Sequence, residues 1–238
     1  MQPRRSILSD ETYAIIRAMI FAHEILPGNR VNIDALALQL SVSQTPIREA
    51  LARLESENLI SKEPMKGYRV TKLLSMKEFT DLFNFSLLIE PFAAGQAAIL
   101  IDAEGIKKIN DEVSSAKKVL VLRSESLINA IMEHDARFHT LVATYTGNKF
   151  LKSSFMNTNS HLHLFRIYVT SQNYLNESSE KSNYSFGELI VKQHVAVAKA
   201  IISHDSEKAK AEMHRHIESS LKRFAPILQH VQEELQPR

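Results

Sequence analysis

The sequence predicts a mainly α-helical fold in two parts, the first containing three short helices and a β-hairpin and the second an all-α bundle. Helical periodicity in short stretches occupies the first sixty residues, two strand-like segments joined by a glycine follow, and longer periodic stretches fill the remainder. A chain of 238 residues with 44% hydrophobic content can bury a sizeable core. We therefore expect two domains, at residues 1–74 and 75–238.

The three short helices of the first domain have clear start and stop signals. Residues 10–25 are periodic and end at a Leu-Pro-Gly turn, and Asn32 can cap a second helix. After a short turn, a third helix is predicted to run to about residue 57, with the Thr45 hydroxyl capping its first turn and Pro46 at its first helical position. Its buried stripe would consist of Ile47, Ala50, Leu51 and Leu54.

The segments "LISKEP", "MKG" and "YRVTKL" then predict a strand, a glycine turn and a second strand. Two short helices joined by a three-residue turn and followed by a hairpin form a winged helix-turn-helix, in which the third helix would enter the major groove of DNA. A three-helix packing module without a ligand is the alternative. The basic residues around the hairpin favour DNA; they are Lys62, Lys66, Arg69 and Lys72.

The second domain is predicted to be an all-α bundle of six or seven helices. A capping box at Ser75–Glu78 opens it, and periodic stretches follow near 78–100, 103–123, 125–145, 149–171, 187–203 and 206–234. Pro91 is expected to break or kink the first of these helices. Residues 176–185 are expected to form a polar loop.

Four ionisable residues on three of these helices are predicted to point into the core. Asp135 and His139 are four residues apart, on the face that carries Ile131 and Met132, and His194 and His216 align with apolar residues of two later helices. Buried charge is costly unless it is paired or coordinates a metal, and one divalent ion would satisfy all four groups. Hydrogen-bonded core histidines are the alternative.

The other histidines are predicted to have no such role. His134, His204 and His214 fall on polar faces or in a loop, so they should be solvent-exposed, and at most one of His161 and His163 could line a pocket. Four nitrogen and oxygen ligands without sulfur suit Zn²⁺ or Ni²⁺ with positions left open. Three neutral histidines and one aspartate leave a divalent ion with a net charge of about +1, which favours an organic-acid carboxylate as the occupant of an open position.

The first domain resembles the N-terminal domain of the GntR family of bacterial transcription regulators. The likeness lies in "LPGNRVNIDALALQLSVSQTPIREALARLESENLI…KGYRV" and covers about residues 10–73. It implies DNA contacts from Ser43, Gln44, Thr45 and Arg48 on the recognition helix and from Lys66 and Gly67 in the wing. The family usually has arginine in place of Gln44 and often a basic residue in place of Asp34. Glutamine reads adenine edges where arginine reads guanine, so the operator is expected to differ from the commoner ones.

The second domain resembles the FCD effector domain of the same family's fatty-acid-regulator subfamily. The likeness lies in "D…FH…TGN" and in the later histidines and covers about residues 75–238. It implies a metal site formed by Asp135, His139, His194 and His216 and a small-acid effector. One departure is Ser86, where the family commonly has an arginine four residues before the glutamate matched by Glu90.

Together these observations predict a regulator, not an enzyme, that binds a palindromic operator as a homodimer and responds to a small effector. One alternative is a helical metalloenzyme with an accessory winged module, although Glu133, the nearest candidate base, is predicted to point away from the site. A DNA-binding protein with a metal-free effector pocket is another. The chain has no cysteine, no signal peptide and no run approaching about 20 apolar residues, so we expect a soluble, cytoplasmic protein without a membrane partner.

Overall fold

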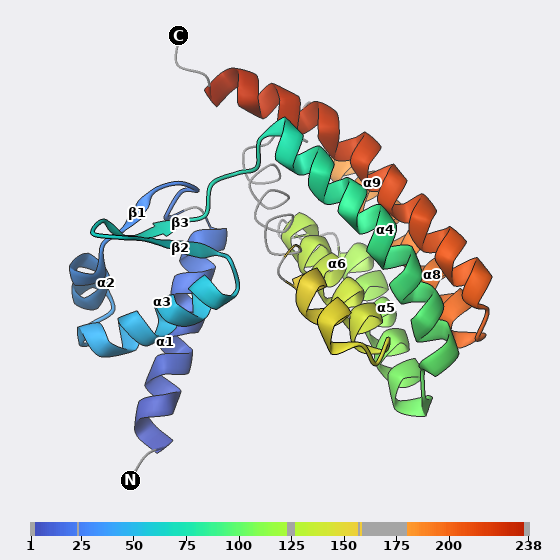
Figure 1. The fold of residues 1–238 in the computed structure, drawn as a ribbon, viewed down its shortest axis with the longest axis horizontal. Helices are drawn as coiled ribbons and strands as arrows, with labels where there is room; N and C mark the ends of the chain where they lie inside the picture. Colours follow the sequence, from blue (N-terminus) through green and yellow to red (C-terminus); the bar gives the residue numbers. More distant parts are fainter. Residues whose placement is uncertain (1–2, 23, 123–126, 157, 159–179, 236–238) are drawn as a thin grey trace. The chain divides into compact units, whose positions relative to one another are not determined.

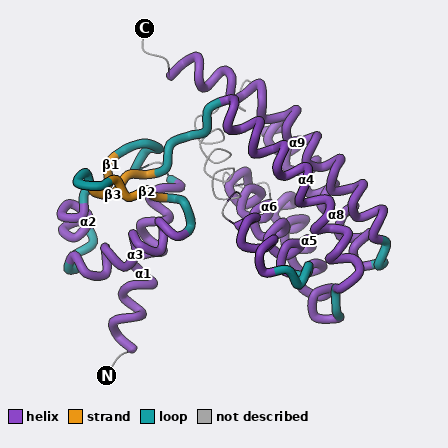
Figure 2. Tube along the Cα trace, in the orientation of Figure 1, coloured by secondary structure: helices purple, strands orange, loops and turns teal. Residues whose placement is uncertain are grey.

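The computed structural model describes residues 3–22, 24–122, 127–156, 158 and 180–235. The chain divides into two compact units, the first extending to Leu73 and the second beginning at Leu74. Figure 1 labels their helices and strands, and Figure 2 shows that every strand belongs to the first unit while the described part of the second is helical. The mainly α prediction is therefore confirmed.

The first unit is a winged helix-turn-helix. Its elements are α1 (Pro3–Phe21), β1 (Arg30–Val31), α2 (Ile33–Gln39), α3 (Gln44–Ser56), β2 (Ile60–Glu63) and β3 (Gly67–Val70). The antiparallel sheet has the order β1-β3-β2, so the predicted hairpin is present and has one further strand. β1 was not predicted because two residues are too few to show an alternating pattern.

A continuous apolar core holds the helices of this unit against its sheet. The predicted stripe of α3 is buried, and it packs with Ile16 and Ile20 of α1 and with Val70 of β3, each of which is fully buried. Asn32 caps α2 as expected, because its side-chain oxygen accepts hydrogen bonds from the backbone N–H groups of Asp34 and Ala35 at 3.0 and 3.1 Å. The buried side of α3, the predicted recognition helix, is thus held in place by the core.

The start of α3 differs from the prediction. The helix begins at Gln44, its N-cap is Ser43 in extended conformation, and the Ser43 side chain makes no capping hydrogen bond. Pro46 is the third helical residue rather than the first, and Thr45 is exposed. Proline fits here because no N–H group in the first turn of a helix has an acceptor within that helix.

The second unit is a helical bundle formed by α4 (Met76–Leu100), α5 (Ala103–Leu122), α6 (Leu127–Thr144), α8 (Glu180–Ile202) and α9 (Ser206–Leu235), with residues 149–156 also helical. Its most extensive contact joins α4 to α9. At Gly95 a Cβ atom would lie 2.6 Å from Lys210 Cε, so a glycine permits this close approach of the two helices.

Three details of the bundle differ from the prediction or lie outside the described residues. α4 continues through Pro91 without a break, because its packing against α9 and the burial of the alanines after Pro91 stabilise the helix there. α8 begins at Glu180, inside the predicted polar loop, because a polar sequence can form the first turns of a helix as well as a loop. The end of the predicted 149–171 helix, with His161 and His163, lies outside the described residues.

α4 is the one helix in the described ranges that is long and apolar enough to cross a membrane, judged by length and composition. The expectation that no run approaches about 20 apolar residues was wrong by the criterion of length and composition. Yet α4 carries the buried polar residues Ser86 and Glu90 and packs along α9, which are features of the core helix of a bundle. Packing against α6, α8 and α9 therefore accounts for the buried face of α4, while a second apolar face of the helix is exposed.

The first prediction concerns the capping box of α4, which is confirmed by the structure. Ser75 Oγ accepts from the backbone N–H of Glu78 at 3.3 Å, and Glu78 Oε2 accepts from the backbone N–H of Ser75 at 2.8 Å. Ser75→Ala should lower the free energy of unfolding by about 1 kcal/mol, measured by chemical denaturation. Ser114→Ala, at an exposed position within α5, is the control and should not destabilise. Equal effects of the two changes would contradict the capping role.

Candidate functional site

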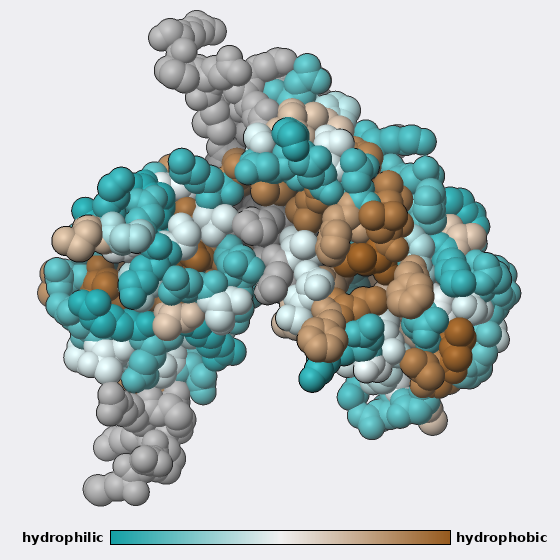
Figure 3. Space-filling view, in the orientation of Figure 1, coloured by the Kyte–Doolittle hydropathy of each residue, from teal (hydrophilic) through white to brown (hydrophobic). Residues whose placement is uncertain are grey.

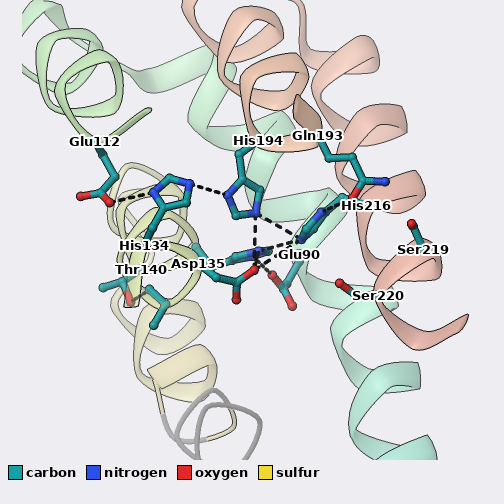
Figure 4. A network of polar contacts seen from close by, with 12 residues as sticks. Glu90, Glu112, His134, Asp135, Thr140, Gln193, His194, His216, Ser219 and Ser220 are labelled. Carbon is teal, nitrogen blue, oxygen red and sulfur yellow. Dashed lines mark hydrogen bonds and ion pairs between the residues drawn. The ribbon is translucent and has the colours of Figure 1, made fainter. Parts of the chain in front are cut away.

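The structure brings together the four residues that the sequence places in the core of the second unit. Asp135 and His139 come from α6, His194 from α8 and His216 from α9. Figure 4 shows Asp135, His194 and His216 directed toward one point. One ligand atom from each residue lies within 4.8 Å of the others, and all four side chains are buried.

The spacing of these atoms matches a small coordination sphere. His216 Nε2 lies 3.1 Å from His139 Nε2 and 3.3 Å from His194 Nε2. Asp135 Oδ1 lies 3.6, 3.8 and 3.9 Å from the Nε2 atoms of His194, His139 and His216. A tetrahedral ion with metal–nitrogen bonds of about 2.0–2.1 Å requires ligand atoms about 3.3 Å apart.

The outer ring nitrogens determine where the protons of two of these histidines lie. His139 Nδ1 is hydrogen-bonded to the Glu90 carboxylate, and His216 Nδ1 lies 3.1 Å from Gln193 Oε1. Carboxylate and amide oxygens accept hydrogen bonds, so each histidine donates from Nδ1 and directs the lone pair of Nε2 inward. Lone pairs 3.1 Å apart repel unless a cation or a proton lies between them. The donor set therefore fits a divalent metal ion.

His134 corrects one of the sequence predictions. It was expected to be exposed, but its side chain is 1% exposed, with Nε2 2.9 Å from His194 Nδ1 and Nδ1 2.8 Å from Glu112 Oε1. The prediction failed because α6 packs against α5 as well as α8, so its second face is covered too. His204, His214 and Glu133 are exposed, as predicted.

Glu112 on α5 completes this network at the surface. Its side chain is 13% exposed and accepts hydrogen bonds from Arg137 Nε at 3.0 and 3.2 Å. Burial acts to raise the pKa of Glu112, but the hydrogen bonds from His134 and Arg137 and the Arg137 charge outweigh it, so the pKa lies below its usual value. Glu112 is therefore ionised at neutral pH.

Three polar neighbours of the cluster were not identified from residue patterns. Glu112 and Gln193 are common surface residue types with no distinctive spacing, and Glu90 was noted only through the family resemblance. Arg223 of α9 lies close by, with Nη1 3.4 Å from Gln193 Oε1 and Nη2 2.9 Å from Ser220 Oγ. Only the packing of α8 against α9 brings Gln193 and Arg223 together.

In the first unit, the residues predicted to contact DNA lie at the start of α3 and at the wing. Ser43, Gln44, Thr45 and Arg48 are exposed. Gln44 Nε2 donates to Asp34 Oδ1 at 2.5 Å, and Arg48 Nη2 donates to Gln44 Oε1 at 3.1 Å. These bonds form a continuous polar row from α2 to α3.

The wing exposes Lys62 and Lys66 and uses another basic residue for structure. Lys66 is exposed in the turn, and Gly67 follows with φ +87°, a conformation that favours glycine. Arg69, counted among the basic residues of the hairpin, is half-buried and donates to the Gly28 carbonyl at 2.5 Å and to Glu63 Oε1 at 3.2 Å. The Arg69 guanidinium therefore stabilises the sheet through these two contacts.

Comparisons with known proteins agree with this architecture. Residues 8–70 match the bacterial regulatory proteins of the gntR family, and residues 81–219 match the FCD domain. The chain is 25% identical over 202 residues to YdhC, an uncharacterized HTH-type transcriptional regulator of Bacillus subtilis, covering 83% of this chain and 89% of that one. It is 21% identical over 211 residues to the HTH-type transcriptional repressor RspR of Escherichia coli, covering 89% and 86%.

Among solved structures, E. coli McbR/YncC shares the fold, with a TM-score of 0.71 at 16% identity over 94% of this chain and 98% of that one. The relatives are transcriptional regulators and not enzymes, which removes the support for a metalloenzyme. The FCD match alone spans more than half of the chain. The protein therefore belongs to the GntR family of bacterial transcriptional regulators, with an N-terminal GntR helix-turn-helix and a C-terminal FCD domain.

Proposed function

We propose that this regulator binds a palindromic operator as a homodimer and responds to a small carboxylate-containing effector at a metal site in its helical domain. The domains are residues 1–74, which bind DNA, and 75–238, which bind metal and effector and form the dimer. A bacterial regulator of this kind acts in the cytoplasm, where the DNA is. The observation that carries the proposal is the convergence of three Nε2 atoms and one carboxylate on α6, α8 and α9.

Asp135, His139, His194 and His216 would hold the metal, and their ligand types suit Zn²⁺ or Ni²⁺. An ion bound there supplies positive charge and a coordination position for an effector oxygen. The chain's own part is to present four ligand atoms, to keep each imidazole in one tautomer and to exclude competing solvent by burial. Asp135 is the single anionic ligand, so the site favours an anion at the open position.

The effector proposal is supported by Arg223. The family's usual arginine is absent at Ser86, which is 2% exposed on α4. Arg223 on α9 instead places a guanidinium beside Gln193, whose side chain also contacts the ligand His216. A guanidinium can pair with a carboxylate through two parallel hydrogen bonds, so Arg223 would bind the far oxygen of a metal-bound acid.

The dimer proposal is supported by the surface of α4. Leu88, Phe92 and Ile99 lie on one face of this helix and are 76, 49 and 58% exposed. Figure 3 shows hydrophobic surface gathered where Figure 1 places α4. One recognition helix contacts too few bases for selectivity, and a two-fold dimer provides two helices for a palindromic site.

In the DNA-binding domain, we propose that Ser43, Gln44, Thr45 and Arg48 meet the major groove, while Lys66 and Gly67 of the wing contact the flanking backbone. Gln44 would read adenine through its amide, exchanging the bonds to Asp34 and Arg48 for the base edge. Arg48 would read a base edge or bind a phosphate.

The second prediction separates these two roles. Arg48→Ala should weaken binding to the operator and, if Arg48 binds a phosphate, lower the salt dependence of the affinity by about one counterion. Gln44→Arg should shift preference toward guanine at one base pair of each half-site, by about 1–3 kcal/mol. Binding to operator variants measured by fluorescence anisotropy checks both.

A matched control for Arg48 is Arg53 on the same helix, whose guanidinium contacts Asp10 and the Tyr13 ring of α1. Arg53→Ala should leave the salt dependence unchanged. Equal affinity of Gln44→Arg for all four bases, with unchanged overall binding, would exclude a reading role for Gln44.

The third prediction concerns the metal. His194→Ala or His216→Ala should lower the metal content of the purified protein and remove its stabilisation by zinc. That stabilisation is expected to be about 2.7 kcal/mol at a zinc concentration of about 100 times Kd. Elemental analysis and thermal melts with and without zinc provide the measurement.

The control is His214→Ala, two residues from His216 but half exposed and 3.6 Å from Glu218. It should retain both metal content and the zinc-dependent rise in Tm. If His214→Ala and His216→Ala behave alike, the proposed ligand set is wrong.

The fourth prediction tests whether the two domains are coupled. Residues 71–75 connect β3 to α4 without regular structure. A flexible Gly-Ser insertion between Lys72 and Ser75 should leave zinc and DNA binding intact while abolishing the effect of zinc on operator affinity, which is about 1–3 kcal/mol in typical coupled systems. Retention of the full effect after the insertion would show that the signal does not pass through this connection.

A further inference from the structure

A fourth imidazole adjoins the metal cluster and is not a ligand in the proposed set. His134 precedes Asp135 on α6, is 1% exposed and lies between His194 of α8 and Glu112 of α5. Figure 4 shows Glu112, His134 and His194 in a row that ends at the cluster. This row spans three helices and ends close to solvent at Glu112.

We propose that His134 is a positioning residue for the metal site. It holds the proton of His194 on Nδ1, so that His194 presents the lone pair of Nε2 to the metal, and Glu112 holds His134 in turn. The inference rests on the metal site proposed above and adds to it two residues, His134 and Glu112, that set the affinity for the ion.

The direction of the hydrogen bonds follows from the acidic end of the row. Ionised Glu112 can only accept, so His134 donates to it from Nδ1 at 2.8 Å. A neutral imidazole that donates from Nδ1 can only accept at Nε2, and the atom 2.9 Å away is His194 Nδ1. His194 must then carry its proton on Nδ1 and direct an unprotonated Nε2 toward Asp135 and His216.

The ring of His194 is fixed in orientation as well as in tautomer. Phe138, one turn along α6 from His134, stacks on it with ring centroids 4.2 Å apart and an interplanar angle of 14°. His134 meets its edge, with centroids 4.9 Å apart at 55°. Phe138 offers no hydrogen bond, so on this side of the ring His134 Nε2 is the group that can hold a proton on His194 Nδ1.

The three ligand histidines are thus supported in two ways. His139 and His216 donate directly to the side-chain oxygens of Glu90 and Gln193, whereas His194 reaches a carboxylate through a second imidazole. Arg137, with a half-exposed side chain, binds the outer side of Glu112. Partners of this kind raise the basicity of a ligand, and their loss commonly lowers metal affinity 10–100-fold.

The test uses full-length protein freed of metal and titrated with zinc in competition with a chromophoric chelator. His134→Phe keeps a ring of similar size and removes both nitrogens, and it should lower zinc affinity about 10–100-fold. His134→Gln places an amide oxygen within reach of His194 Nδ1 and should recover most of the loss. His214→Phe makes the same substitution at an exposed position of α9 and should leave zinc affinity unchanged.

A second measurement is independent of bound metal. Long-range ¹H–¹⁵N spectra of the metal-free protein should show His194 protonated only at Nδ1, and His134→Phe should give a mixture of its two tautomers. If His134→Phe does not fold, Glu112→Gln at the rim of the row provides the variant. Glu112→Gln removes the charge but keeps an oxygen, so it should lower zinc affinity by a smaller factor than His134→Phe.

Three outcomes would overturn the inference. Wild-type zinc affinity in His134→Phe would show that His194 needs no partner, and an equal loss in His134→Gln and His134→Phe would show that only ring packing matters. A wild-type protein that binds no zinc would overturn the metal site itself together with this inference. The first two results, obtained with wild-type protein that binds zinc normally, would leave the metal site standing.

Discussion

The bundle of the FCD domain is organised around four donor atoms that point at one another. Nε2 atoms 3.1 and 3.3 Å apart and a buried carboxylate do not make a stable apolar core on their own, because lone pairs repel and buried charge is costly. Each imidazole also has a partner at its outer nitrogen. Glu90 and Gln193 hold His139 and His216 in the tautomer that directs a lone pair inward, and we infer that His134 does the same for His194. A cation at the centre satisfies every one of these groups, so it would tie α6, α8 and α9 together.

In the proposed function, this constraint would give the protein a means of regulation. An ion held by side chains of three helices is sensitive to small shifts among them, and a ligand at its open position bears on the same helices. Arg223 and Gln193 extend the polar surroundings of the site along α8 and α9, where we propose that an acidic effector binds. In the DNA-binding domain, a buried apolar core packs against one side of α3, and Gln44 and Arg48 are exposed on the helix.

Sequence periodicity was sufficient for the helices and for the four clustered residues, because a helix face is defined by spacing alone. The stripe of α3, the caps at Asn32 and Ser75 and the inward faces of His194 and His216 all follow from local pattern.

What local pattern could not provide was the number of neighbours around each helix. α6 packs against α5 as well as α8, so His134 is buried although the sequence pattern places it on a polar face of the helix. Glu112 and Gln193 become partners of the site only through packing between helices. β1 and the start of α3 likewise depend on tertiary contacts and on the tolerance of a first helical turn for proline.

The central claim is that the convergent atoms surround a metal ion. X-ray absorption at the metal edge of protein purified without chelators measures this directly. The structure predicts a shell of nitrogen and oxygen ligands at about 2.0–2.1 Å, with multiple scattering from three imidazole rings and no sulfur. The same spectrum from His194→Ala should lose one imidazole contribution. A purified protein without metal, or a spectrum of oxygen ligands only, would contradict the claim and leave the four side chains to share protons in place of an ion.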